Sequence, residues 1–130
     1  MSLLKDGQIK NSVIGIGLNV NQDSFPPHLK NVTSVKQILH ADYDLRNLLS
    51  EICSHIEAWY LNLRAGKVSF VRNEYLKRLY WLNESRGFKT QNGIFNGVIK
   101  DVKDNGLLIV QNNIGEELEF SLKEIEFLNK

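Results

Sequence analysis

The chain has 130 residues, of which 42% are apolar and 24% are charged, a balance that suits one ordinary globular domain or two very small ones. Sixteen Lys and Arg against fifteen Asp and Glu give a net charge of +1, which excludes a bulk attraction to DNA or to an anionic membrane. No apolar run reaches the length of a transmembrane helix, and the N-terminus lacks the apolar stretch of a signal peptide.

A short hairpin is expected around Asp6-Gly7, and a strand is expected after it over residues 13–20. Residues 13–20 form a nearly continuous apolar, β-branched run without helical spacing. Such a run predicts a strand buried on both faces. A strand of this kind needs neighbours on both sides, and the sequence offers one short hairpin. We therefore expect the chain to be the C-terminal piece of a larger domain.

Three helices follow. Thr33 or Ser34 caps a short helix that ends near residue 39, and Asp44 caps a long one that ends before Gly66. The long helix carries an apolar stripe at i, i+3, i+4 spacing: Leu45, Leu48, Leu49, Ile52, Cys53, Ile56, Trp59, Tyr60 and Leu63. A third helix is expected over residues 68–82.

Cys53, the chain's one cysteine, lies on the apolar stripe of the long helix. We therefore interpret it as a small buried apolar residue rather than a nucleophile. A single cysteine cannot form an intramolecular disulfide, so we expect a reduced, cytoplasmic protein.

After residue 86 the apolar residues no longer follow helical spacing and instead form short runs typical of strands. Runs at residues 88–90, 94–99, 107–110, 118–121 and 125–127 are separated by Asn-Gly and other turn sequences. Several short strands in so few residues predict a small SH3-like barrel. The sequence thus predicts an α+β protein with a boundary near residue 86.

Residues 15–19 are the segment that best suits a ligand. Gly15 and Gly17 stand at i and i+2 and leave one face of the predicted strand bare, so that a flat ligand can lie against the backbone. Asn19 shares that face, and its amide offers the donor and the acceptor that a purine edge requires. Alternatively, the glycines make room for a packed helix or form a bulge, and spacing alone favours this alternative. A dinucleotide fingerprint is excluded because the third glycine and the following helix are missing.

One stretch of the chain reads Val13-Ile14-Gly15-Ile16-Gly17-Leu18-Asn19-Val20-Asn21-Gln22. It resembles the late catalytic-domain strand of the biotin–protein ligases. The similarity continues through Phe25-Pro26, through residues 32–35 and the helices, and into the barrel, so that it covers essentially the whole chain. It implies the end of a mixed catalytic-domain sheet with packed helices over residues 1–86, followed by an SH3-like barrel over residues 87–130.

The resemblance also implies a two-step reaction. Biotin and ATP–Mg²⁺ form biotinyl-5′-AMP, and a lysine of a biotin carboxyl carrier protein then takes up the biotin. By the same resemblance Gly15, Ile16 and Gly17 line the biotin and adenylate pocket and Asn19 binds adenine. The family's Gly/Arg-rich loop and essential lysine lie upstream of this strand and are not in this sequence. We therefore expect these residues alone to be inactive and assign no catalytic residue among them.

A different class of function stays open: a stand-alone module, a helical hairpin with a small barrel, that binds a protein or a nucleic acid. Lys77-Arg78 with neighbouring aromatic residues is the candidate nucleic-acid surface, although a solvated helix face explains these residues better. The three histidines show no metal-ligand spacing. The unpaired strand argues against the module, and we expect it to pair with a second copy in a homodimer unless it folds against the long helix.

Overall fold

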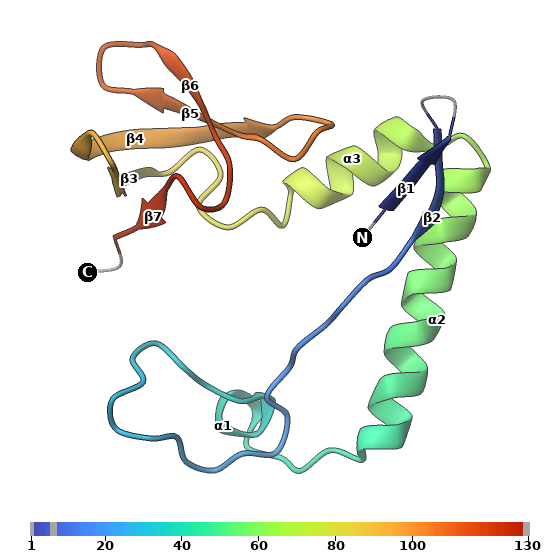
Figure 1. Cartoon of the computed structure of the whole chain (residues 1–130). Helices are drawn as coiled ribbons and strands as arrows, with labels where there is room; N and C mark the ends of the chain where they lie inside the picture. The colour runs from blue at the N-terminus through green and yellow to red at the C-terminus, as the bar shows by residue number, and fades with distance from the viewer. Residues whose placement is uncertain (1, 6–7, 129–130) are drawn as a thin grey trace. The chain divides into compact units, whose positions relative to one another are not determined.

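The computed structural model describes residues 2–5 and 8–128 (Figure 1). It is an α+β structure, as predicted, with helices and an antiparallel five-stranded sheet. The chain divides into two compact units, Met1–Glu57 and Ala58–Lys130, and the division falls within the long helix.

The first unit contains a hairpin, a stretched segment and a short helix. Strands β1 (Ser2–Lys5) and β2 (Gln8–Ser12) pair antiparallel, and helix α1 (Val35–Leu39) is capped by Ser34, whose side chain accepts a hydrogen bond from the Gln37 N–H. Helix α2 (Leu45–Arg64) begins after Asp44, whose Oδ1 lies 2.8 Å from the Asn47 nitrogen. The predicted caps of both helices are therefore confirmed.

The expected strand over residues 13–20 is absent. These residues form a stretched connection without secondary structure between β2 and the loop that leads to α1 (Figure 1). Val13, Ile14 and Ile16 are 74%, 65% and 59% exposed, so the prediction of burial on both faces is wrong for this chain. A strand exists only through its ladder partners, and the described residues supply no ladder partner along residues 14–20.

Helix α2 has the predicted start and the predicted stop, because Gly66 takes a left-handed φ of +75° just after it. Its apolar stripe, however, is only partly covered by described residues, and none of the residues of the helix is buried. Cys53 is exposed, which corrects the expectation that its side chain is buried.

The second unit is built on a five-stranded antiparallel sheet of order β6-β5-β4-β3-β7. Its strands are β3 (Ser85–Thr90), β4 (Gly93–Val102), β5 (Leu108–Asn112), β6 (Glu117–Phe120) and β7 (Glu126–Phe127). All five lie where the sequence predicts them, and β3 begins one residue before the predicted boundary. Ladder pairing leaves β6 and β7 as end strands, so closure into an SH3-like barrel stays a prediction, as does the division into domains 1–86 and 87–130.

Helix α3 (Val68–Leu76) is shorter than predicted. The chain leaves it through tight turns, and Trp81 and Asn83 both take a left-handed φ of +61°. This turn inserts Trp81, 7% exposed, into the core formed with Phe88, Ile99 and Val110. Burying the indole offsets the cost of ending the helix early, a gain that the local pattern does not reveal.

Two contacts attach α3 within its unit. Phe70 stacks on Trp59 at the end of α2, with ring centroids 5.9 Å apart. Arg72 forms an ion pair with Asp101 at 2.8 Å and with Asp104 at 3.0 Å, and it also donates to the Val102 carbonyl. The guanidinium therefore connects the helix to the β4–β5 hairpin.

Candidate functional site

The stretched segment has two different faces. Its even-numbered side chains Ile14, Ile16, Leu18 and Val20 line an open apolar groove together with the stripe of α2 (Leu45, Leu48, Leu49, Ile52, Cys53 and Ile56). Gly15, Gly17 and Asn19 alternate with these residues and so belong to the other face. Although residues 13–20 form no strand, their side chains still alternate between two faces, as the sequence predicts.

Neither glycine is required by packing among the described residues. A Cβ atom added at Gly15 or Gly17 would meet no heavy atom within 4 Å. Gly97 in β4 is the opposite case, since a Cβ there would lie 2.7 Å from Val110 Cγ1. The packed helix that the sequence left open as an explanation for Gly15 and Gly17 is not found in the described chain, and the bare face lies open.

Asn19 is exposed at the end of this face. Its Nδ2 donates to the Thr33 carbonyl at 3.3 Å, a long hydrogen bond, and no described residue donates to its Oδ1. Its backbone carbonyl accepts from the Val35 N–H at 2.9 Å. The carboxamide therefore keeps an acceptor and a second N–H with which it can bind a ligand.

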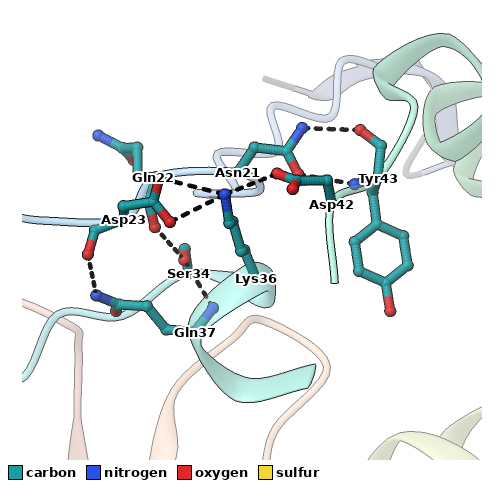
Figure 2. A network of polar contacts seen from close by, with 8 residues as sticks. All are labelled: Asn21, Gln22, Asp23, Ser34, Lys36, Gln37, Asp42 and Tyr43. Atoms are coloured by element: carbon teal, nitrogen blue, oxygen red, sulfur yellow. Dashed lines mark hydrogen bonds and ion pairs between the residues drawn. The ribbon is translucent and has the colours of Figure 1, made fainter. Parts of the chain in front are cut away.

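A polar network that the sequence analysis did not identify holds the loop after Asn19 (Figure 2). Asn21 Nδ2 donates to the Tyr43 carbonyl at 2.8 Å, and the Tyr43 N–H donates to Asn21 Oδ1 at 2.9 Å. Ser34, 1% exposed, donates through its hydroxyl to the Gln22 carbonyl at 2.6 Å. The helix cap at Ser34 is visible in the sequence, whereas the partners of Asn21 and Gln22 lie too far along the chain to be read from it.

Lys36 joins the same network from α1. Its ammonium lies 2.9 Å from Asp42 and 3.0 Å from Asp23, and these two carboxylates raise the pKa of Lys36 above its usual value. Both aspartates are more than two-thirds exposed, so the ion pairs are screened by solvent and add little stability. The two ion pairs instead help to fix the position of the loop at Asp23 relative to Asp42.

The remaining candidates of the sequence analysis lie outside this segment. Lys77 and Arg78 both pair with Glu74, at 2.5 and 2.7 Å, while Trp81 belongs to the core of the second unit. Trp81 therefore does not share a surface with the two basic residues, whereas the exposed Tyr75 and Tyr80 line one open pocket with Arg78. Within residues 2–5 and 8–128, no group of three or more His, Cys, Asp or Glu residues could hold a metal ion, and no helix is long and apolar enough to span a membrane.

The sequence of the chain is similar to those of known proteins. No family model matches the chain. It is 25% identical over 114 residues to the bifunctional ligase/repressor BirA of Bacillus subtilis (strain 168), and equally so to BirA of Bacillus spizizenii. The resemblance to biotin protein ligases is confirmed. These matches cover 85% of the chain but 35% of each BirA protein.

Solved structures of biotin protein ligases share the fold of the chain. The biotin protein ligase of Aquifex aeolicus in complex with biotin and ATP superposes with a TM-score of 0.69 at 18% identity, over the whole chain and 54% of that protein. A second crystal structure of the same ligase gives a TM-score of 0.65 at 17% identity, over 85% of the chain and 50% of that protein. The chain thus spans about half the length of these ligases.

Proposed function

We propose that the chain is part of a biotin protein ligase and that the face formed by Gly15, Gly17 and Asn19 is one wall of its biotinyl-5′-AMP pocket. The observation that carries the proposal is the bare face itself. No described atom lies within 4 Å of a Cβ at either glycine, and the opposite face carries the apolar side chains. Open backbone beside an exposed carboxamide suits a ligand with a flat ring system and a polar edge.

The proposed biotinylation reaction has two steps. In the first, a carboxylate oxygen of biotin attacks the α-phosphorus of ATP, and pyrophosphate leaves. In the second, a lysine amine of a biotin carboxyl carrier protein attacks the acyl carbonyl of the anhydride, loses a proton, and AMP leaves. Gly15 and Gly17 allow the adenylate to approach the backbone, the main chain at Ile16 forms part of the wall, and Asn19 binds the adenine edge.

ATP enters such a reaction as its Mg²⁺ complex, and the ion neutralises charge on the phosphates when bound. We assign no residue of this chain as its ligand, because no acidic cluster of the necessary kind occurs among the described residues. We place the protein in the cytoplasm, where the free thiol of Cys53 stays reduced. The SH3-like domain at residues 87–130 completes the proposed architecture.

The test is a pair of glycine substitutions in the full-length protein, with biotin and ATP binding measured by calorimetry. Gly17→Ala should weaken biotin or ATP binding by about tenfold or more, equivalent to about 1.4 kcal/mol, while thermal stability stays unchanged. Gly87→Ala is the matched control, since a Cβ there meets only ordinary contacts of 3.6 Å and longer. Unchanged binding in Gly17→Ala would contradict the proposed pocket. A full-length protein that binds neither biotin nor ATP would favour the stand-alone binding module.

A further inference from the structure

Residues 19–23 are attached to α1 at almost every carbonyl group. The Val35 and Lys36 N–H groups donate to the Asn19 and Val20 carbonyls, both at 2.9 Å. The Ser34 hydroxyl donates to the Gln22 carbonyl at 2.6 Å, and Gln37 Nε2 donates to the Asp23 carbonyl at 2.8 Å. The loop is therefore bound to α1 through its backbone, and its sequence register on the helix is fixed.

Asn21, in the middle of the loop, is held differently from its neighbours. Its planar amide forms two hydrogen bonds with the backbone of one residue, Tyr43, at 2.8 and 2.9 Å (Figure 2). Two bonds from one rigid group fix its rotation as well as its position. The Lys36 ammonium provides a parallel connection, because it bridges Asp23 in the loop and Asp42 beside Tyr43. The loop is thus attached both to α1 and to the turn before α2.

Asn19 and Asn21 carry the same side chain two residues apart but use it in opposite ways. The Asn21 amide is engaged by the chain itself, whereas Asn19 makes one long hydrogen bond and receives none at Oδ1 from the described residues. We propose that Asn21 is a positioning residue: its contacts with Tyr43 fix residues 19–23, which are bonded to α1, against the turn before α2 and thereby orient the Asn19 carboxamide toward the adenine. The second half of this inference rests on the function proposed above.

The experiment is a double-mutant cycle with two readouts. Asn19→Ala, Asn21→Ala and the double variant are made in the full-length protein, and ATP and biotin binding are measured by calorimetry. Hydrogen exchange at the Val35 and Lys36 amides, which donate to the loop, reports on attachment without any ligand. Asn62→Ala is the matched control, because the Asn62 amide donates to the Ala58 carbonyl within its own helix.

We expect Asn21→Ala to speed exchange at both amides about tenfold and to weaken ATP binding about tenfold, with biotin binding and the control unchanged. The double variant should bind ATP no more weakly than Asn19→Ala, because both changes remove the same interaction. Unchanged exchange would overturn the positioning role, and additive losses would show that Asn21 does not act through Asn19. If Asn19→Ala leaves ATP binding intact, the adenine role of Asn19 fails, and with it the orientation of that side chain by Asn21.

Discussion

Gly97 in β4 is the position where adding one methyl group should harm the sheet most. A Cβ at this residue would lie 2.7 Å from Val110 Cγ1 and 3.0 Å from both the Gln111 carbonyl oxygen and Phe95 Cε2. The first two neighbours belong to β5, which pairs with β4, and Val110 is fully buried. Neither a buried valine nor a strand carbonyl can move aside without disturbing the ladder.

The magnitude follows from two opposing effects. Overpacking a filled core by one methyl group costs about 1–3 kcal/mol. Replacing glycine by alanine in a compatible backbone conformation recovers about 0.4–1 kcal/mol, because the unfolded chain becomes less flexible. We therefore expect Gly97→Ala to destabilise the second unit by about 1–2 kcal/mol, which corresponds to a fall in Tm of roughly 4–16 °C for a unit of this size.

The assay is urea unfolding followed by tryptophan fluorescence, since Trp81 is 7% exposed in the same core. The midpoint should fall while the denaturant dependence of the unfolding free energy stays constant. Gly87→Ala in β3 is the control and should be neutral or slightly stabilising, because its Cβ would find Leu128 at 3.6 Å. Wild-type stability in Gly97→Ala would refute the close approach of β4 and β5 described here.

Four further outcomes are expected. Asn19→Ala should weaken ATP binding to the full-length protein by about 1–3 kcal/mol and leave biotin binding nearly intact, and Asn19→Asp should do at least as much harm; equal losses for both ligands in calorimetry would indicate a structural role. The 130 residues as a separate polypeptide should release no pyrophosphate from ATP and biotin, and release above background would contradict this. The exposed apolar segment at residues 12–20 should associate with a second copy, so sedimentation of a strict monomer at high micromolar concentration would count against that homodimer. Lys77 and Arg78 hold the pKa of Glu74 below its ordinary 4.5, so stability is present above that pH and is lost as the pH falls below it; urea midpoints of Glu74→Gln should show a weaker acid dependence.

Local signals in the sequence determined most of the elements. The caps at Ser34 and Asp44, the stop at Gly66 and the turns between the strands each depend on residues within one turn of one another, so these element ends could be predicted from the pattern alone. The alternation along residues 14–20 was equally local, and it placed the two glycines and Asn19 on the face opposite to the apolar side chains.

Only the tertiary structure decided which of these patterns became buried. Helix α3 ends at Leu76 because Trp81 enters a core formed by residues far along the chain. Residues 14–20 form no strand because a strand needs a ladder partner that no local pattern provides. Asn21 forms hydrogen bonds with Tyr43, 22 residues further along the chain, and the local sequence does not distinguish Asn21 from Asn19. Whether a carboxamide binds its own chain or remains open to a ligand depends on contacts between segments that folding brings together, and sequence spacing does not encode them.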